Sequence, residues 1–403
     1  MVSRTLGVES EDVGAPTHAC GRVGCVAENL RHHVLVERAR ELEPGNECRH
    51  REIVRSPLER VRLSPVIQAA IQTLLDGHDL GREEAREVMD EIMAGEATPA
   101  QISGFLVALR AKGETADEIA GCAEAMRAHV LPVHPTRADV VDVVGTGGDG
   151  ARTFNISTTA AIVAAAAGAA VAKHGNRAVS SVSGSADVLE ALGFTLEQPP
   201  ERIAESIDTL GFGFMFAPLH HPAMRHAAPV RRELGTRTIF NVLGPLTNPA
   251  GARSGVFGVY AADVARTVAD ALAVLDSRRA FVVHGANGID ELSPAGPNLV
   301  FEVADGEVRE RVIDPAELGI GPCDPAELAG GTPEENAETA RAVLAGATGA
   351  KRDAVVLNAA GAIAAAGHAD DLREGLALAE EAIESGRAAA RLDELVAFSR
   401  ESP

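Results

Sequence analysis

From residue 140 onwards, short apolar runs alternate with loops and helical patterns, and this alternation limits the possible folds more than any other feature. Val140 to Val144 is a run typical of a strand buried on both faces, and a glycine-rich loop and a helix from Ser157 follow it. Val171 to Lys173 is a second short strand, which a loop and a helix over 186–192 follow. Repeated strand–loop–helix units build parallel sheets covered by helices, so the pattern predicts an α/β domain.

The rest of the chain extends this prediction. Further strands are expected over 255–260 and 280–283, and the runs 299–303 and 308–313 flank Asp305-Gly306, which predicts a hairpin. From Thr332-Pro333 the pattern is mainly helical, and no repeat of fixed period occurs. We therefore expect a mainly parallel central sheet flanked by helices.

Four helical patterns precede this α/β region. Ser64 is suited to cap a helix that begins at Pro65 and ends near Gly77. Three more helices are expected over 82–94, over 99–111 and from Thr115 to about residue 130. These patterns predict a small α-helical domain over 63–133 and a larger α/β domain over 134–403, with the helices of 218–240 packing on the helical domain.

Residues 1–62 are polar and lack sustained periodicity, which predicts a disordered N-terminal extension. Cys20, Cys25, Cys48 and His50 lie in this segment, but their spacing matches no strong zinc pattern. The sequence shows no signal-peptide pattern and no apolar run of spanning length. The net charge of -21 argues against sequence-independent binding to nucleic acid. We expect a cytoplasmic protein that binds neither nucleic acid nor membranes.

The loop after the first predicted strand has the composition of an anion-binding site. It reads Gly145-Thr146-Gly147-Gly148-Asp149, and Thr153 and the run 155–158 follow it. Glycines let backbone N–H groups approach an anion closely, and the N-terminus of the next helix favours the same charge. Asp149 is better suited to accept hydrogen bonds from sugar hydroxyls or to organise the loop. On its own, the motif could also be an ordinary turn between a strand and a helix.

A second polar loop follows the second predicted strand. It reads Lys173-His174-Gly175-Asn176-Arg177 and continues through Ser180-Ser181 to Ser185. Because ligands of open α/β sheets lie at the carboxyl ends of the strands, both loops can face one ligand. Two cations, several hydroxyls and free N–H groups suit a polyphosphate. His174 alone could equally be a structural histidine.

Two further segments carry charged side chains suited to binding. Asp290-Glu291 follows the strand predicted over 280–283 and could hold one or two magnesium ions, although an acidic pair on a loop is often only solvated surface. His220-His221 and Arg231-Arg232 lie between proline turns, where an arginine can bind a carboxylate through two parallel hydrogen bonds. A helical hairpin with surface arginines is the alternative for that segment.

In their order and spacing, these four segments resemble the anthranilate phosphoribosyltransferases of tryptophan biosynthesis, whose fold is related to that of nucleoside phosphorylases. The resemblance runs from about residue 64 to the end of the chain and includes the stretch 352–360. It implies a magnesium-dependent enzyme that joins anthranilate to phosphoribosyl pyrophosphate and releases pyrophosphate. It also implies a homodimer formed through the helical domain.

The resemblance implies the following site residues by position. The phosphoribosyl pyrophosphate site contains Gly145, Gly148, Asp149, Thr153, Asn155, Ile156, Ser157, Thr158, Lys173, His174, Gly175, Asn176, Arg177, Ala178, Val179, Ser180, Ser181 and Ser185. The magnesium ligands are Ser157, Asp290 and Glu291, and the anthranilate contacts are Gly145, Asn176, Arg231 and His221. No residue is assigned as a general base, because the aromatic amine is already neutral near neutral pH. The number of magnesium ions, one or two, stays open.

Two other functions are compatible with parts of the pattern. A pyrimidine nucleoside phosphorylase shares the architecture but needs a nucleobase pocket and free phosphate, whereas Asn176-Arg177 and Asp290-Glu291 favour the transferase. A non-catalytic relative that binds nucleic acid would call for a basic helix and altered phosphate loops, and the strongly negative net charge argues against it.

Overall fold

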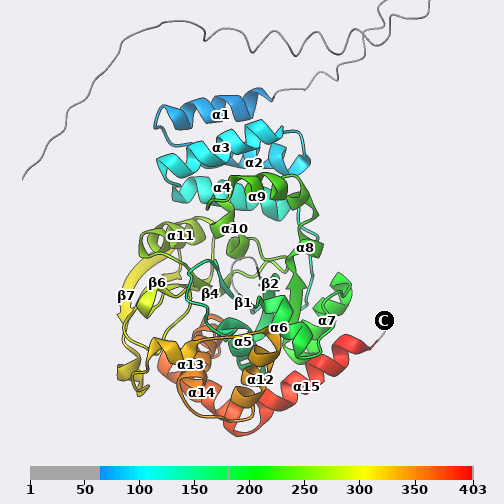
Figure 1. The fold of residues 1–403 in the computed structure, drawn as a ribbon, viewed down its shortest axis with the longest axis vertical. Coiled ribbons are helices and arrows are strands. Elements are labelled where there is room, and N and C mark those ends of the chain that lie inside the picture. Colours follow the sequence, from blue (N-terminus) through cyan, green and yellow to red (C-terminus); the bar gives the residue numbers. More distant parts are fainter. Residues whose placement is uncertain (1–63, 179–181, 402–403) are drawn as a thin grey trace, which may run out of the picture. The chain divides into compact units, whose positions relative to one another are not determined.

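The computed structural model describes residues 64–178 and 182–401 (Figure 1). Four helices come first: α1 (Pro65–Leu75), α2 (Arg82–Ala94), α3 (Pro99–Lys112) and α4 (Ala116–Ala128). Their beginnings follow from capping side chains, because Ser64 accepts a hydrogen bond from the Val66 N–H and Thr98 and Thr115 form capping boxes. The predicted extension over 1–62, with its cysteines, lies outside the described residues.

A seven-stranded sheet forms the centre of the remaining described chain. Its strands are β1 (Val140–Gly145), β2 (Ala170–Gly175), β3 (Phe212–Phe216), β4 (Ser254–Gly258), β5 (Arg279–His284), β6 (Asn298–Ala304) and β7 (Glu307–Ile313). The strand order is β3-β2-β1-β4-β5-β6-β7. Strands β1 to β5 run parallel to one another, β6 runs antiparallel to β5, and β7 runs antiparallel to β6. The mainly parallel sheet and the hairpin at Asp305-Gly306 are therefore confirmed.

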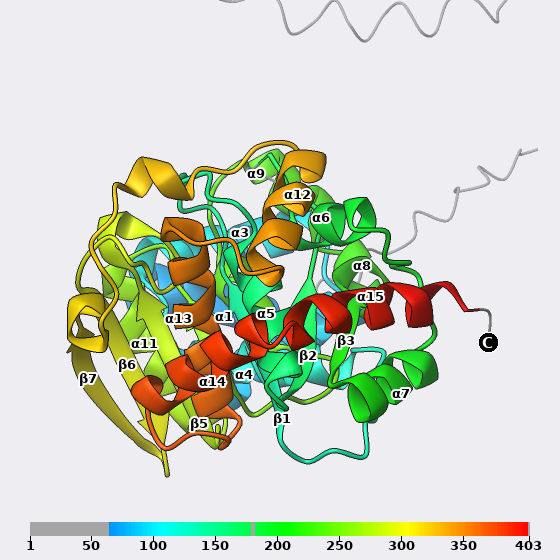
Figure 2. The ribbon, with the colours of Figure 1, turned by 90° about the horizontal axis from the view of Figure 1, so that it is seen from below.

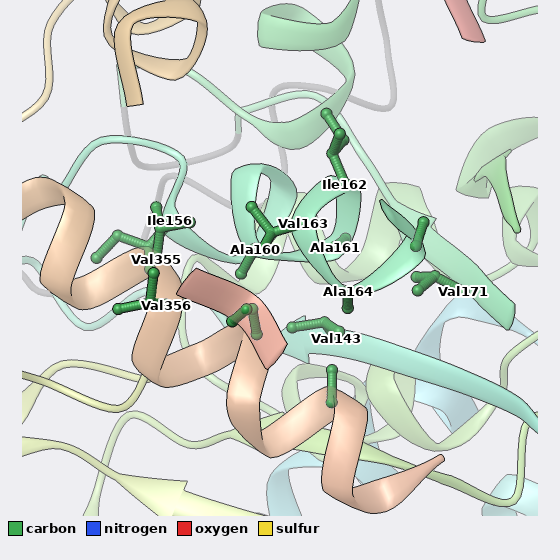
Figure 3. Close-up of a cluster of buried hydrophobic side chains, with 14 of the residues drawn as sticks. Val143, Ile156, Ala160, Ala161, Ile162, Val163, Ala164, Val171, Val355 and Val356 are labelled. Atoms are coloured by element: carbon green, nitrogen blue, oxygen red, sulfur yellow. The ribbon is translucent and has the colours of Figure 1, made fainter. Parts of the chain in front are cut away.

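One face of the sheet is covered by α5 (Ile156–Ala166) and α13 (Ala350–Ala365), as seen from below in Figure 2. Figure 3 shows Val143 and Val171 of the strands among Ala160, Ala161 and Ala164 of α5, with Val355 and Val356 of α13 in the same cluster. The small alanine side chains let α5 lie close to both the sheet and α13. Further out on this side are α6 (Ser185–Ala191), α12 (Pro333–Leu344), α14 (Leu372–Glu384) and α15 (Arg387–Arg400).

The other face of the sheet is covered by α11 (Ala262–Val274), against β5 and β6, and by α7 (Pro200–Leu210), against β2 and β3. The apolar cluster under α11 continues through α9 (Ala228–Leu234) and α10 (Phe240–Leu246) into the core of the four N-terminal helices. Short helical turns, α8 (Ala217–His220) and η1 (Pro222–Arg225), precede α9. The four N-terminal helices thus share one apolar core with α9, α10 and α11.

Elements that were not predicted from the sequence include α7, β3 and α11. The strand β3 reads Phe-Gly-Phe-Met-Phe, and a glycine inside so short a run weakens the strand pattern. A Cβ at Gly213 would lie 2.6 Å from Ile207 Cγ1 and 2.9 Å from Ile203 Cγ2, so the glycine lets α7 pack closely on β3. None of the helices in the described residues combines the length and hydrophobicity that a membrane span requires.

Candidate active site

The order of the strands locates the site. Chain connections run from β1 outwards to β2 and β3, and then return to the other side of β1 with β4. Open α/β sheets bind ligands at such a reversal, beyond the carboxyl ends of the strands. A cavity of about 700 Å³ lies there, lined by the loops after β1, β2 and β5, by residues of 217–247, and by Met126 of α4. The helical bundle therefore contributes one lining residue, Met126, to the cavity.

The glycine-rich loop after β1 is held by main-chain contacts to β4. Thr146 N–H donates to the Gly258 carbonyl at 2.9 Å, and Thr146 Oγ1 accepts from the Tyr260 N–H at 3.1 Å. Gly147 and Gly148 have φ of 68° and 73°, which a residue with a Cβ rarely adopts. Asp149 accepts a hydrogen bond from the Ala151 N–H at 3.0 Å, so this carboxylate organises the loop.

The end of β1 and the end of β4 both lie against Asp290. A Cβ added at Gly145 would overlap the Asp290 carboxylate, and one added at Gly258 would overlap the Asp290 carbonyl oxygen. Glycine at these two positions is what allows the loop after β5 to approach the glycine-rich loop so closely.

The acidic pair follows β5 and the turn η2 (Ala286–Gly288). Asp290 Oδ2 accepts a hydrogen bond from the Gly147 N–H at 2.6 Å, and Glu291 Oε1 accepts from the Ser157 N–H at 2.9 Å. Glu291 Oε2 is buried and has no hydrogen-bond partner among the described residues. Burial, with the nearby Asp149 carboxylate, raises the pKa of Asp290 to about 7, and burial beside Asp290 raises the pKa of Glu291 to about 8.

These raised pKa values mean that the positive charge of Lys173 does not fully offset the cost of burying two carboxylates side by side. A hard divalent cation would supply the remaining positive charge, and the carboxylates and the Ser157 hydroxyl are the oxygen ligands that Mg²⁺ prefers. Within the described residues, no three His, Cys, Asp or Glu side chains cluster as a self-contained metal site. A cation held here would therefore complete its coordination with oxygens of water or of a bound phosphate.

Lys173 lies beneath the cavity, between the strand ends. Its Nζ donates to the Val143 carbonyl at 2.6 Å and lies 3.5 Å from Ser157 Oγ. Burial lowers the pKa of Lys173, while Asp142, Glu291 and Asp290 act in the opposite direction. The lysine thus places positive charge between the acidic pair and the buried Asp142.

Asp142 is fully buried inside β1. It accepts hydrogen bonds from the His174 N–H at 3.3 Å and from Asn248 Nδ2 at 2.7 Å, and Asn248 also donates to the Ala172 carbonyl at 2.8 Å. Burial raises the pKa of Asp142 to about 6. Through these bonds β1, β2 and the segment after α10 are joined directly below the cavity.

The loop after β2 bends back on α6. Ser185 Oγ accepts from the Asn176 N–H at 3.1 Å, and the exposed guanidinium of Arg177 pairs with Asp187 at 2.9 Å and Glu190 at 2.7 Å. The predicted site residues Val179, Ser180 and Ser181 lie outside the described residues. Arg177 therefore lines the cavity while bound to two carboxylates of α6.

Two histidines and an arginine also line the cavity. The rings of His174 and His221 lie 4.9 Å apart, and the Nε2 atom of each is buried with no hydrogen-bond partner in the described chain. Burial lowers the pKa of His174 to about 3 and that of His221 to about 4, so both rings are neutral near neutral pH. Arg231 Cζ lies 5.1 Å from the centre of the Phe240 ring.

Arg231 differs from Arg177 in having no ion pair to any described residue. Burial lowers its pKa. A partly desolvated guanidinium beside the Phe240 ring is suited to a carboxylate on an aromatic molecule, because it binds both carboxylate oxygens in one plane.

Most of the predicted site residues line this one cavity. They are Gly145, Gly148, Asp149, Thr153, Asn155, Ser157, Thr158, Lys173, His174, Gly175, Asn176, Arg177, Ala178, Ser185, His221, Arg231, Asp290 and Glu291. Ile156 is not among the lining residues, because its side chain is fully buried in the core between α5 and α13.

Some lining residues were not in the predicted set, among them Met126, Arg152, Arg225, Asn241 and Thr247. Asn241 and Thr247 stand in the polar segment after Arg231, so the pattern there was a usable signal. Met126 carries no local signal, because it reaches the cavity only through the packing of α4 on α10.

Comparison with known proteins gives matches along nearly the whole described chain. The model "Glycosyl transferase family, a/b domain" matches residues 137–389, and "Glycosyl transferase family, helical bundle domain" matches 68–130. The anthranilate phosphoribosyltransferase of Moorella thermoacetica is 53% identical over 333 residues, which are 83% of this chain and 98% of the relative. That of Desulforudis audaxviator is 54% identical over 335 residues, 83% of this chain and 96% of the relative.

Solved structures agree with these relatives. The crystal structure of anthranilate phosphoribosyltransferase from Thermus thermophilus is 51% identical, with a TM-score of 0.79, and covers 82% of this chain and 99% of its own. The enzyme from Saccharomyces cerevisiae in complex with PRPP and Mg is 30% identical, with a TM-score of 0.75, over 83% of this chain and 97% of its own. The same yeast enzyme has been solved with 4-fluoroanthranilate, at 28% identity and a TM-score of 0.74, over 83% of this chain and 97% of its own.

Proposed function

The chain belongs to the anthranilate phosphoribosyltransferases, and we infer from this membership and from its cavity that it transfers the phosphoribosyl group of phosphoribosyl pyrophosphate to the amine of anthranilate. The products are N-(5-phosphoribosyl)anthranilate and pyrophosphate, and the reaction belongs to tryptophan biosynthesis. One observation carries this function above all: a single cavity of about 700 Å³ joins two anion-binding loops, an acidic pair and a desolvated arginine without an ion pair to any described residue.

The donor is assigned to the two loops after β1 and β2. The glycine-rich loop, the first turn of α5 and the segment 173–178 offer N–H groups and hydroxyls that suit phosphate oxygens. Asp149 is placed to organise the loop rather than to touch a phosphate. The yeast relative solved with PRPP and Mg supports the assignment of this donor.

Magnesium is assigned to Asp290, Glu291 and Ser157. The buried Glu291 Oε2, without a partner among the described residues, and the raised pKa values of the pair support this choice of ligands. When bound, Mg²⁺ would neutralise the pyrophosphate and stabilise the charge that develops on it as it leaves. Lys173 adds a buried positive charge close to the same ligands.

Anthranilate is assigned to the wall formed by Arg231, His221, Asn176 and the end of β1 at Gly145. Arg231 holds the carboxylate and thereby directs the amine towards the anomeric carbon of the donor. A C–N bond forms as the bond from that carbon to pyrophosphate breaks, and the amine releases one proton to solvent water. The neutral amine needs little activation, so the chain acts mainly by positioning and electrostatics.

We also propose that a second copy of the chain binds to the helical bundle. Leu75 of α1 and Val107 of α3 are 67% and 47% exposed, although both are large apolar side chains. The two helices pack together, since a Cβ at Gly104 of α3 would lie 3.2 Å from Ile71 Cδ1. Light scattering after gel filtration tests this dimer, and the double variant Leu75→Asp, Val107→Asp should elute as a monomer.

The decisive test of the reaction follows the fluorescence of anthranilate. The purified full chain with Mg²⁺ and phosphoribosyl pyrophosphate should remove anthranilate from solution, and omission of any one component should stop the loss. Formation of pyrophosphate, measured in the same samples, should equal the loss of anthranilate. A full chain that binds both substrates but forms no product would contradict the proposed function.

A further inference from the structure

Asn155 stands at the N-terminus of α5, yet its side chain makes no hydrogen bond to the first turn of that helix. An asparagine in this position usually accepts a hydrogen bond from an N–H two or three residues later. Here Oδ1 accepts from Ser183 Oγ at 3.1 Å and from Asn336 Nδ2 at 2.9 Å, while Nδ2 donates to the Ser183 carbonyl at 3.2 Å. The side chain is therefore directed away from the helix and towards two distant segments.

Asn336 belongs to α12 and is 181 residues away from Asn155 in the sequence. Its side chain is buried, and Oδ1 accepts a hydrogen bond from the Gly331 N–H at 2.8 Å. With Nδ2 bonded to Asn155, the amide group of Asn336 is held at both ends. Neither of its bonds belongs to the capping box of α12, which is formed by Thr332 and Glu335.

The main chain before Asn336 also forms hydrogen bonds with residues 152–154, in the loop between β1 and α5. Phe154 N–H donates to the Leu328 carbonyl at 3.0 Å, and Gly330 N–H donates to the Arg152 carbonyl at 2.9 Å. A Cβ at Gly330 would lie 2.7 Å from the Phe154 nitrogen, closer than any side chain allows. The segment 328–336 thus holds residues 152–155 through two main-chain hydrogen bonds and through the side chain of Asn336.

We propose that Asn336 is a positioning residue for the phosphoribosyl pyrophosphate site, and this inference rests on the proposed function. By occupying Asn155 Oδ1, Asn336 keeps Asn155 from capping α5, so that the phosphate oxygens of the donor would compete at the Ser157 N–H with Glu291 and not also with Asn155. Because Asn155 is also bonded to Ser183, the same contact fixes the loop after β1 to the loop after β2. Asn336 itself does not line the cavity and touches no substrate.

Two substitutions separate this role from general support of the fold. Asn336→Ala removes both bonds, whereas Asn336→Asp keeps an acceptor for Gly331 but places a carboxylate oxygen against Asn155 Oδ1. Both should raise the KM for phosphoribosyl pyrophosphate by about tenfold, the size expected for one lost hydrogen bond that orders a site. The KM for anthranilate should stay within about twofold of the wild-type value, because Arg231 and His221 are untouched.

Glu335→Ala is the matched control. It removes the capping-box bond from Glu335 to the Thr332 N–H, one residue before Asn336, and leaves Asn155 bonded as before. It should lower the melting temperature by less than the Asn336 variants, because Glu335 is exposed and Asn336 is buried, and it should change neither KM. Should Asn336→Ala fail to fold, Asn336→Asp and Asn336→Ser carry the same comparison.

The measurements are steady-state kinetics for each substrate and calorimetric titration of phosphoribosyl pyrophosphate with Mg²⁺ into the full chain. Donor affinity weakened in the Asn336 variants alone supports the inference. Wild-type donor affinity in those variants, or an equal loss in Glu335→Ala, overturns it. A wild-type chain that binds the donor without forming product would count against the proposed function and leave the titrations as the test of Asn336.

Discussion

Asp290 Oδ2 accepts a 2.6 Å hydrogen bond from the backbone N–H of Gly147, which joins two segments 143 residues apart. Glu291 Oε1 likewise accepts a hydrogen bond from the backbone N–H of Ser157, at 2.9 Å. Both amides belong to the loop and helix start that we assign to phosphate oxygens. In this structure the two carboxylates therefore occupy N–H donors that an anionic substrate would use, and we expect a bound substrate to displace these contacts.

The affinity for Mg²⁺ should increase with pH. The pKa values of Asp290 and Glu291, about 7 and about 8, leave both carboxyls largely protonated below about pH 6. A cation binds the ionised forms, so protons must be released first. We expect the Mg²⁺ concentration that gives half-maximal activity to fall by about tenfold or more between about pH 6 and about pH 8. A half-maximal concentration that is constant over this range would contradict the ligand assignment.

The substitution Asp290→Asn should stabilise the metal-free chain at alkaline pH. A carboxyl whose folded-state pKa lies above its unfolded value supports the fold at low pH, and this support is lost as pH rises through the folded pKa. Near pH 8, without Mg²⁺, the variant should melt about 2 °C above the wild type, and near pH 4 the two should melt together. Asp305→Asn, in the exposed hairpin turn, is the control for the exchange of a carboxylate for an amide. Scanning calorimetry of the three chains at both pH values provides the comparison.

The substitution Arg231→Ala should act on anthranilate alone. Loss of the guanidinium that holds the carboxylate through two bonds should raise the KM for anthranilate by about tenfold to a hundredfold, with the KM for the donor unchanged. Arg231→Lys should recover only part of the loss, because an ammonium group lacks the planar geometry. Arg232→Ala, the exposed neighbour, should behave as the wild type. An equal change in both KM values would refute the assignment.

The substitution Asn248→Ala should destabilise the sheet beneath the cavity. It removes the donors to Asp142 and the Ala172 carbonyl and leaves the buried Asp142 carboxylate with fewer partners. We expect a loss of about 2–4 kcal/mol in the free energy of unfolding, measured with denaturant, because a buried charge loses a hydrogen bond. Asn287→Gly, on the exposed turn after β5 where φ is 64°, should cost far less, because glycine adopts this backbone without strain. Equal costs would show that the bonds of Asn248 contribute little.

The sequence predicts the architecture well where local patterns and tertiary packing agree. Apolar runs and caps mark β1, α5 and the first four helices, and glycine loops after adjacent parallel strands are bound to meet at one sheet edge. The strand β3 was not predicted, because Gly213 weakens the local strand pattern while it allows α7 to pack closely, and that packing is not a local property of the sequence. Met126 and Asn336 were not predicted for the same reason. Met126 lines the cavity, and Asn336 contacts the lining residue Asn155, only because of packing between segments far apart in the sequence.

Gly145 and Gly258 place a limit on how this site can change. Since any side chain at either position would overlap Asp290, the glycine-rich loop and the acidic pair cannot be moved independently of each other. To enlarge the donor pocket by design, the loop after β1 and the loop after β5 would have to be moved together. Variants at these glycines should consequently lose cation and donor binding in the same step, even though Gly258 itself is not among the residues that line the cavity.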